Sequence, residues 1–419
     1  MIYSNKIAVI GLGYVGLPLS LEFGKKFITL GFDINKERVK QLINGLDINN
    51  EFNKNDFKIS KNLEFTNQIS DIKGCNIYIV TVPTPLDKHQ APDLNSLIQA
   101  TTMIGSLLKK KDIVIYESTV YPGCTEEECV PVLEKESGLK FNLDFSCGYS
   151  PERVNPGDKV NTLSKIVKVT SGSNKSTADF VDQLYSSIIE AGTFKAVSIK
   201  VAEASKVIEN AQRDVNISFV NELALIFDRL NLDTNDVIDA ASTKWNFIKL
   251  RPGLVGGHCI SVDPYYLAHK AKMAGYYPEV ILSGRRVNEN MSKFITSACI
   301  KLMINKGQKI KNLNALILGV TFKENCGDIR NSKVFDIHNE LLEYGLNVDL
   351  FDPHANKEEV KKEYGLNLVN INSKYNLIIL AVSHSEFSDL NIINLKADNK
   401  TVIYDVKSFL DRTISDKRL

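Results

Sequence analysis

The 419-residue sequence lacks an excess of either charge and any long apolar run. Lys and Arg total 51 against 50 Asp and Glu, so no global field attracts nucleic acid or an anionic membrane. No apolar run approaches the ~20 residues that a membrane span needs. Glycines interrupt the apolar N-terminal stretch, which is typical of a strand and turn rather than a signal peptide. We therefore expect a cytoplasmic protein without nucleic-acid or membrane partners.

The sequence also lacks paired cysteines. Its seven cysteines are scattered, odd in number and without a CxxC motif, which favours reduced thiols in a cytosolic protein. Cys124 and Cys129 are the closest pair, and no second Cys or His pair with zinc-finger spacing accompanies them, so no metal is expected. Cys259, in GLVGGHCISVD at 253–263, could be a buried small hydrophobe, a metal ligand or a nucleophile.

Apolar β-type runs alternate with helical patterns at both ends of the chain. Short strands with helices between them predict parallel sheets covered on both faces. The two series match in order, so we predict an α/β fold with two related, doubly wound, Rossmann-like domains. The runs occupy residues 6–13, 28–33, 76–83 and 112–119, and then 314–320, 346–352, 376–383 and 400–406.

The middle of the chain is helical. Residues 201–231 contain no Gly or Pro, and from Val215 on the segment is apolar around most of its circumference. Such a helix is expected to be buried at a subunit interface, so we expect a homodimer. A second helical region covers about residues 265–306. We predict domains at 1–200, 201–308 and 309–419, the central one helical.

The first series carries a dinucleotide-binding pattern. Gly11, Gly13 and Gly16 follow a strand directly and open a helix, which suits a tight turn, a close approach to a pyrophosphate, and helix–strand packing. Asp33 ends the next strand 22 residues after Gly11, where a carboxylate binds the adenosine ribose and repels a 2′-phosphate. The alternative is a turn that serves packing only. The pattern predicts NAD rather than NADP.

The second series lacks these glycines, although Asp352 ends one of its strands. This second series therefore predicts a different nucleotide, with Lys323 and Arg330 supplying positive charge, unless both are solvated surface cations.

On the long helix, Lys206, Asn210 and Arg213 fall at i, i+4 and i+7, on one face. The flanking apolar sequence favours burial of this face, and a buried charge needs an anionic partner.

These motifs together resemble the UDP-glucose/GDP-mannose dehydrogenase family along essentially the whole chain. The segments that carry the resemblance are GLGYVGLP (11–18), TVPTP (81–85), ESTVYPG (117–123), SPERVNPG (150–157), KVIENAQRDVNISFVNE (206–222), GGHCISVDP (256–264) and FKENCGDIRNS (322–332). The resemblance implies NAD in the first Rossmann-like domain, UDP in the second, the sugar between them, and a central helical dimerisation region.

The chain departs from the UDP-glucose branch of this family at two places. Pro156 stands where that branch usually has a second glutamate. In the cysteine motif of this chain, His258 stands at a position that varies in that branch, and Val262 stands where that branch has a lysine. These variants resemble the branch that oxidises UDP-N-acetylhexosamines for capsule and O-antigen synthesis. The resemblance implies four-electron oxidation at C6, with UDP-GlcNAc favoured over UDP-GalNAc, and UDP-glucose or UDP-ManNAc as alternatives.

The resemblance also implies residue roles. Cys259 would form a thiohemiacetal and then a thioester, with Lys206 and Asn210 stabilising its oxyanion, and Asp263, Thr119 and Glu152 acting on protons or water. Substrate would be lined by Lys206, Asn210, Arg153, Val154, Arg213, Arg251, Gly256 and Lys323. NAD would contact Gly11, Gly13, Tyr14, Val15, Gly16, Asp33, Arg38, Thr84, Thr119 and Arg330.

Two competing functions stay open at this point. A two-electron β-hydroxyacid-type dehydrogenase would use a lysine and an asparagine on such a helix, but it would need no cysteine and would lack the third domain. A catalytically inactive nucleotide-sugar-binding protein would keep the fold and lose the chemistry. The presence of Cys259, Lys206, Asn210 and Asp263 argues against the second alternative.

Overall fold

The computed structural model describes residues 5–48, 51–154, 160–257 and 260–419. The chain packs as two compact units. The first consists of residues 1–209 and 265–276, and the second of residues 210–264 and 277–419. Cys259 and Pro156 lie outside the described residues.

The first unit is built on an eight-stranded sheet in the order β3-β2-β1-β4-β5-β6-β7-β8. Its neighbours are parallel except for the antiparallel pair β6 and β7. The strands are β1 (Lys6–Ile10), β2 (Ile28–Phe32), β3 (Leu63–Thr66), β4 (Ile77–Val80), β5 (Ile113–Tyr116), β6 (Ser146–Tyr149), β7 (Lys168–Gly172) and β8 (Thr193–Lys195). The near-continuous apolar sequence of β1, β4 and β5 reflects burial of these strands on both faces.

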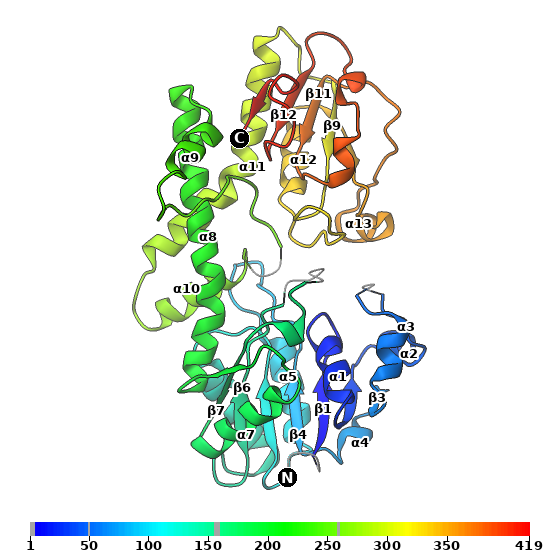
Figure 1. The fold of residues 1–419 in the computed structure, drawn as a ribbon, viewed down its shortest axis with the longest axis vertical. Coiled ribbons are helices and arrows are strands. Elements are labelled where there is room, and N and C mark those ends of the chain that lie inside the picture. The colour runs from blue at the N-terminus through cyan, green and yellow to red at the C-terminus, as the bar shows by residue number, and fades with distance from the viewer. Residues whose placement is uncertain (1–4, 49–50, 155–159, 258–259) are drawn as a thin grey trace. The chain divides into compact units, whose positions relative to one another are not determined.

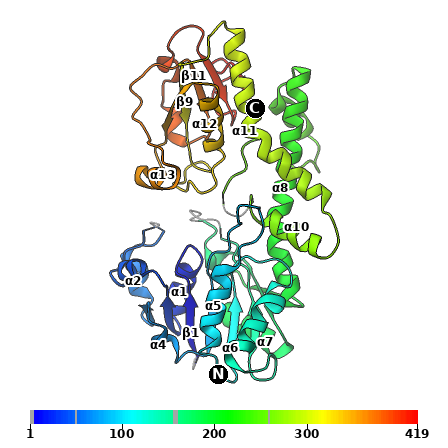
Figure 2. The same ribbon diagram turned by 180° about the vertical axis from the view of Figure 1, so that it is seen from behind.

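Helices cover both faces of this sheet, as the two opposite views show (Figures 1 and 2). They are α1 (Gly16–Gly24), α2 (Lys36–Ile43), α3 (Lys54–Ile59), α4 (Ile69–Ile72), α5 (Asn95–Gly105), α6 (Val130–Ser137) and α7 (Lys175–Ser186). A π-helical turn, Thr125–Cys129, leads into α6. The core beneath them combines residues of β1, β4 and β5 with Leu19 and Phe23 of α1 and Leu184 of α7.

The second unit holds a five-stranded parallel sheet in the order β10-β9-β11-β12-β13. The strands are β9 (Asn314–Leu318), β10 (Asn347–Phe351), β11 (Leu377–Leu380), β12 (Val402–Asp405) and β13 (Lys417–Arg418). Helices α12 (Val334–Glu343) and α13 (Lys357–Tyr364) connect them. The predicted α/β class and both doubly wound sheets are confirmed, including all eight strands predicted from the apolar runs.

Long helices supply the middle of the chain. Helix α8 (Ile199–Leu230) covers the predicted segment, and α9 (Thr234–Ala241) follows it. The predicted region 265–306 consists of α10 (Asp263–Met273) and α11 (Glu279–Asn305). The break between them contains Gly275, which has φ +80°, and Pro278, which caps α11.

Candidate active site

The glycine loop between β1 and α1 has the geometry of a pyrophosphate cradle. Gly11 has φ +96°, and its amide donates to the carbonyl of Phe32 at 2.8 Å. A Cβ on Gly16 would lie 1.8 Å from the carbonyl oxygen of Gly11, whereas a Cβ on Gly13 would meet no heavy atom within 4 Å. Gly16 thus serves close packing, and Gly13 leaves open space over the start of α1. Tyr14 and Val15 are half-buried beside it.

The carboxylate of Asp33 lies against this loop. Its Oδ2 accepts a hydrogen bond from the amide of Leu12 at 2.8 Å, and its Oδ1 accepts one from the amide of Asn35 at 2.9 Å. Each oxygen keeps a further lone pair, which suits the two hydroxyls of an adenosine ribose. Arg38 is turned inward: its Nε donates to the carbonyl of Leu12 at 3.0 Å, and its Nη1 lies 3.0 Å from Asp47. These groups fit the adenosine half of NAD.

Two predicted NAD residues meet at the carboxyl ends of β4 and β5. The hydroxyl of Thr84 donates to the carbonyl of Thr119 at 2.7 Å. The hydroxyl of Tyr266, on α10, donates to the carbonyl of Thr84 at 2.8 Å. Parallel α/β sheets bind ligands outside the carboxyl ends of such neighbouring strands. Thr84 and Thr119 therefore share one edge with the glycine loop after β1.

Glu152 follows β6 at the same edge. Its Oε1 accepts hydrogen bonds from the amides of Arg153 and Val154 at 2.7 and 2.6 Å, and its Oε2 accepts one from Lys168 Nζ at 3.1 Å. Arg153 forms an ion pair with Glu209 at 3.0 Å. Glu152 therefore accepts hydrogen bonds from two backbone amides and from a lysine, unlike a carboxylate that faces only solvent. Sequence analysis did not single out Lys168.

Helix α8 begins with a buried acidic residue and a buried basic residue. Glu203 is fully buried, and its carboxylate accepts hydrogen bonds from the amides of Gly123 and Thr125 at 2.5 and 2.9 Å. Burial raises the pKa of Glu203 to about 7. Lys206, one turn later, is 7% exposed. The predicted burial of Lys206 is confirmed.

In the second unit, two predicted catalytic residues contact each other. The side-chain amide of Asn210 donates to Oδ2 of Asp263 at 2.6 Å. Asn210 is 7% exposed and Asp263 is 1% exposed. Asn210 comes from α8, four residues after Lys206, and Asp263 is the first residue of α10, four residues after Cys259. The fold thus joins two motifs that are 53 residues apart.

Two predicted substrate arginines lie elsewhere in this unit. Arg213 is exposed, so the prediction that the whole face of Lys206, Asn210 and Arg213 is buried was wrong. Asp214 occupies the buried position instead and pairs with Arg285 at 2.6 Å. Arg251 is exposed and donates to Asn235 at 2.6 Å and to Asp239 at 2.5 Å, both on α9.

The glycines before Cys259 pack against the segment 322–332. A Cβ on Gly256 would lie 2.6 Å from the carbonyl oxygen of Asn331, and one on Gly257, which has φ +83°, would lie 3.0 Å from the ring of Phe322. Asn331 also donates its amide to the carbonyl of Gly257 at 3.3 Å. Gly256 and Gly257 therefore allow the close approach of their backbone to the segment 322–332 of the same unit.

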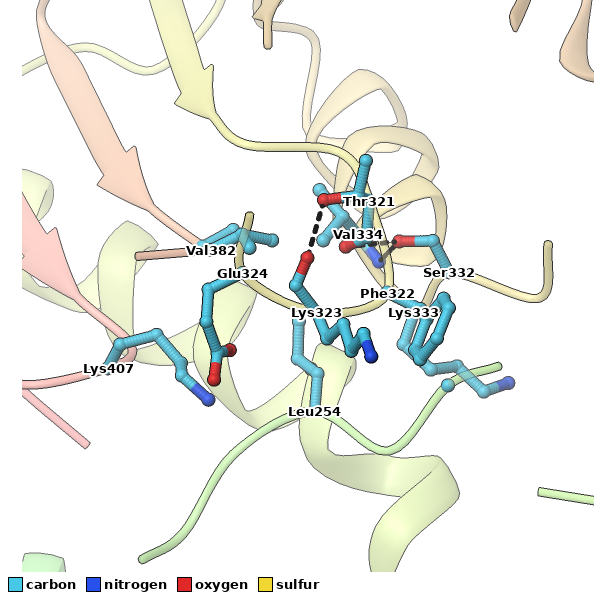
Figure 3. A pocket seen from close by; sticks show the side chains of 12 residues that line it. Leu254, Thr321, Phe322, Lys323, Glu324, Ser332, Lys333, Val334, Val382 and Lys407 are labelled. Atoms are coloured by element: carbon cyan, nitrogen blue, oxygen red, sulfur yellow. Dashed lines mark hydrogen bonds between the residues drawn. The ribbon is translucent and has the colours of Figure 1, made fainter. Parts of the chain in front are cut away.

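A pocket opens at this junction (Figure 3). Lys323 comes from the loop after β9, Lys407 from the loop after β12, and Lys333 from the residue before α12. The N-terminus of α12 and the ammonium groups of Lys323 and Lys407 favour an anion such as a diphosphate, while Lys333 already forms an ion pair with Asp336 at 3.1 Å. The lining residues are Leu254, Gly256, Thr321, Phe322, Lys323, Glu324, Ser332, Lys333, Val334, Ala381, Val382 and Lys407. Lys407 was missed, although it directly follows the last predicted strand.

The second sheet repeats the first but blocks its ribose position. Gly319 has φ +86°, and the amide of Val320 donates to Asp352 Oδ2 at 2.6 Å, as Leu12 donates to Asp33. In this repeat the same oxygen also contacts Nε2 of the fully buried His384 at 3.0 Å. Because His384 takes the place of a ribose hydroxyl, Asp352 does not offer a second NAD site.

Arg330 lies in this second unit. Its guanidinium forms a forked ion pair with Asp328, with Nε at 2.9 Å from Oδ1 and Nη2 at 2.5 Å from Oδ2. The predicted contact of Arg330 with NAD stays a prediction.

Comparison with known proteins decides the family. The UDP-glucose/GDP-mannose dehydrogenase family matches this chain with three domains: its NAD binding domain over residues 5–189, its central domain over 200–290 and its UDP binding domain over 316–412. The chain belongs to this family. The predicted family, dehydrogenase class and NAD cofactor are confirmed, and the UDP binding domain supports a UDP-sugar as substrate.

Individual relatives cover nearly the whole chain. UDP-N-acetyl-D-glucosamine 6-dehydrogenase of Salmonella typhi is 54% identical, covering 99% of this chain and 98% of its own. The Pseudomonas aeruginosa protein of the same name is 56% identical, covering 99% of both chains. Among solved structures, the UDP-D-ManNAc dehydrogenase of Pyrococcus horikoshii superposes with a TM-score of 0.89 at 28% identity, covering 99% of this chain and 98% of its own.

Within the described part of the chain, no helix is both long and apolar enough to cross a membrane.

Proposed function

We propose that this protein oxidises C6 of UDP-N-acetyl-D-glucosamine to the carboxylate, using two NAD per sugar. The contact between Asn210 and Asp263 carries the proposal, because it joins α8, which also carries Lys206, to the first residue of α10, which follows Cys259 by four residues in the sequence. Two relatives with more than half of their residues identical to this chain are named UDP-N-acetyl-D-glucosamine 6-dehydrogenases, which supports the choice of sugar.

The first oxidation removes a hydride and a proton from the C6 alcohol. NAD, when bound, accepts the hydride of each oxidation. Lys206, held in a buried position, supplies the positive charge that stabilises the alkoxide, and Asn210 supplies a neutral donor. Donors aimed at such an oxyanion are commonly worth roughly 3–4 kcal/mol each.

The second oxidation requires that the aldehyde again carry a transferable hydrogen. The Cys259 thiolate adds to the aldehyde carbon, and the resulting thiohemiacetal loses its hydride to become a thioester. Water then adds to the thioester carbonyl, the carbon–sulfur bond breaks, and Cys259 leaves as the thiolate. Asp263, Thr119 and Glu152 are the groups proposed to hold this water and take its proton.

The pocket of the second unit is the proposed binding site for the UDP part of the substrate. Lys323, Lys333 and Lys407 are proposed to bind the diphosphate of UDP, at the carboxyl ends of β9 and β12 and the start of α12. Gly256 lines this pocket, and a side chain there would collide with the carbonyl oxygen of Asn331. Arg153, Val154, Arg213 and Arg251 remain proposed substrate contacts from the family resemblance.

The proposed homodimer has structural support on α8. Phe219, Ile226 and Leu230 are 57%, 44% and 60% exposed, at i, i+7 and i+11. This spacing places three large apolar side chains along one stripe of the helix, which suits pairing with another helix. Cytoplasmic location is proposed from the scattered, odd-numbered cysteines, and a role in surface polysaccharide synthesis is proposed from the family resemblance.

Stoichiometry with a panel of sugars tests the function. UDP-GlcNAc, UDP-GalNAc, UDP-ManNAc and UDP-glucose are each incubated with enzyme and NAD, and NADH is counted per sugar consumed. We expect two NADH per UDP-GlcNAc, and the highest kcat/KM for that sugar. One NADH per sugar would indicate a two-electron dehydrogenase, and none would indicate a binding protein. A higher kcat/KM for UDP-glucose than for both UDP-GlcNAc and UDP-GalNAc would refute the acetamido assignment.

A further inference from the structure

The first unit contains a buried ammonium group, which the chemistry proposed above does not use. Lys168, the first residue of β7, has a side chain that is 3% exposed. Its Nζ lies 2.7 Å from Oε2 of Glu117 and 3.1 Å from Oε2 of Glu152, and 5.6 Å from the ring centre of Tyr185. Removing one partner from such a buried group of charges is costly, so each member constrains the others.

The cluster sits at the ligand-binding edge of the sheet. Glu117 directly follows β5, and Glu152 follows β6 by three residues. In the antiparallel pair of β6 and β7, Gly148 lies opposite Gly172 and Tyr149 opposite Ser171. Continuing this register brings Lys168 opposite Glu152, beyond the carboxyl end of β6. The lysine thus meets the proposed water-holding residue at the edge that also carries Thr119.

Glu152 has both oxygens engaged by fixed donors. The amides of Arg153 and Val154 hold Oε1, and Lys168 holds Oε2. Burial by itself raises the pKa of Glu152, but the Lys168 ammonium and the amide of Val154 outweigh it and leave the pKa below its usual value. A carboxylate in this state can accept a proton or orient a water, and it cannot rotate freely.

Glu117 competes for the same ammonium. Its Oε1 accepts a hydrogen bond from the Tyr185 hydroxyl, on α7, and its Oε2 faces Lys168. Burial raises the pKa of Glu117, although Lys168 opposes this, and the charge of Glu152 raises it further. Glu117, Glu152, Lys168 and Tyr185 are the titratable groups of this cluster. With one cation between two carboxylates, the protonation of Glu152 depends on Lys168.

We propose that Lys168 is a positioning residue for the oxidation, which keeps Glu152 ionised and fixes the orientation of the loop 150–154. This inference rests on the proposed function, in which Glu152 acts on water or a proton. Lys168 does not touch the sugar; it acts through Glu152. The loop that it fixes also carries Arg153 and Val154, so its loss affects the sugar-binding side of the edge rather than the glycine loop after β1.

The test is the pH dependence of kcat in Lys168→Met, which keeps most of the apolar stem and removes the charge. Without the ammonium, two buried carboxylates face each other and share a proton, so the pKa of Glu152 rises. We expect kcat at pH 7 to fall by up to about 100-fold, the loss that a misplacement of about 1 Å can cause, and the acid limb of the profile to move to higher pH. The dissociation constant of NAD should stay within about threefold of wild type, because the glycine loop is untouched.

Two further variants serve as matched controls. Lys168→Arg keeps the cation and should restore the wild-type acid limb. Glu117→Gln removes a negative charge from the same cluster, so that Lys168 interacts with Glu152 as its one remaining carboxylate. The acid limb of this variant should stay in place or move to lower pH. If Lys168→Met does not fold, the double variant Lys168→Met/Glu117→Gln removes one charge of each sign. Its acid limb should still lie at higher pH than that of wild type.

The outcomes separate this inference from the proposed function. Wild-type enzyme that oxidises none of the UDP-sugars refutes the proposed function. Wild-type turnover together with a Lys168→Met profile that superimposes on that of wild type, even at a lower Tm, shows that Lys168 only stabilises the fold. An acid limb that moves equally in Lys168→Met and Glu117→Gln would also overturn the inference, because the two changes should act in opposite directions.

Discussion

The side-chain amide of Asn210 donates a hydrogen bond to the carboxylate of Asp263, 2.6 Å away, in a region where both side chains are almost fully buried. One residue comes from the middle of α8 and the other from the first position of α10. The nitrogen of the Asn210 amide points at Asp263, because it donates the hydrogen bond that the carboxylate oxygen accepts. The amide oxygen then faces away from Asp263.

Replacing Asn210 by Asp should therefore convert this contact into a repulsive one. Two carboxylates at this distance cannot both ionise, so one of them takes up a proton with a raised pKa. We expect kcat to fall about 100-fold at pH 8, since a neutral donor is lost from the oxyanion, and the deficit relative to wild type to shrink toward pH 6. Initial rates of NADH formation between pH 6 and 9 measure this.

Asn221 provides the control for that experiment. It is also a buried amide on α8, but it bonds to the backbone of Gly253 and to Asn288 instead of a carboxylate. Asn221→Asp should lower Tm without changing the shape of the pH profile. A profile for Asn210→Asp that parallels that of wild type would mean that Asn210 and Asp263 do not act together in turnover.

The glycine loop allows cofactor binding to be separated from folding. A methyl group on Gly13 meets no atom of the protein, whereas one on Gly16 would lie 1.8 Å from the carbonyl oxygen of Gly11. Gly13→Ala should keep the wild-type Tm of the free protein and raise the dissociation constant of NAD about tenfold or more, which corresponds to at least about 1.4 kcal/mol. Gly16→Ala should lower the unfolding free energy by roughly 1–3 kcal/mol.

Calorimetric NAD titrations and thermal unfolding of both variants measure these effects. UDP binding should be unaffected in Gly13→Ala, because the UDP binding domain is a different part of the chain. Equal losses of Tm in the two variants would contradict the distinction between an open and a packed glycine.

Much of this arrangement could be predicted from the sequence, because the relevant signals are local. Gly11, Gly13 and Gly16 follow a strand at fixed spacing, and the apolar runs of both sheets are nearly unbroken. Strand β6 was missed because Ser146 and Gly148 interrupt its apolar pattern. Strand β7 was missed because it begins with a lysine, and lysines are rarely buried.

The remaining site features depend on tertiary contacts. The register of β6 and β7 brings the loop of Glu152 against Lys168, and this contact cannot be derived from the neighbours of Lys168 in sequence. Arg213 was expected to be buried because its helix is apolar. The helical repeat instead places Asp214 on the inner face, where Arg285 of α11 neutralises it. Which residue of this helix is buried could therefore be determined only from the helix that packs against it.

Glu203 should make stability depend on pH. Its pKa is raised by burial from 4.5 to about 7, so the folded state binds its proton more tightly than the unfolded state does. This contribution is fully present below pH 4.5 and is lost as the pH rises through 7. The unfolding free energy of wild type should fall by about 3 kcal/mol across this window relative to Glu203→Gln.

Urea unfolding at pH 5, 6, 7 and 8 measures the difference between the two proteins. Glu222, which is exposed on the same helix, gives the control variant Glu222→Gln. That variant should follow the wild-type curve at every pH. Parallel curves for wild type and Glu203→Gln would show that the carboxyl of Glu203 titrates alike in the folded and unfolded states.

Among the cysteines, the prediction of a nucleophile concerns Cys259, which lies outside the described residues. The described cysteines provide a contrast: burial raises the pKa of Cys75 to about 11, and it also raises the pKa values of Cys147 and Cys299. These thiols should be protonated and unreactive at neutral pH. Cys326 is half-buried and serves as the control site.

Cys259→Ala and Cys259→Ser should each lower formation of the uronic acid by about 10³-fold or more, as removal of a covalent nucleophile commonly does. NAD and UDP-sugar binding should be retained, because neither change disturbs the glycine loop or the lysines proposed to bind UDP. Cys326→Ser should turn over normally. Wild-type enzyme quenched during turnover, digested and analysed by mass spectrometry should carry a UDP-uronyl thioester on Cys259. A label on another residue, or turnover near that of wild type in either Cys259 variant, would show that this cysteine serves packing alone.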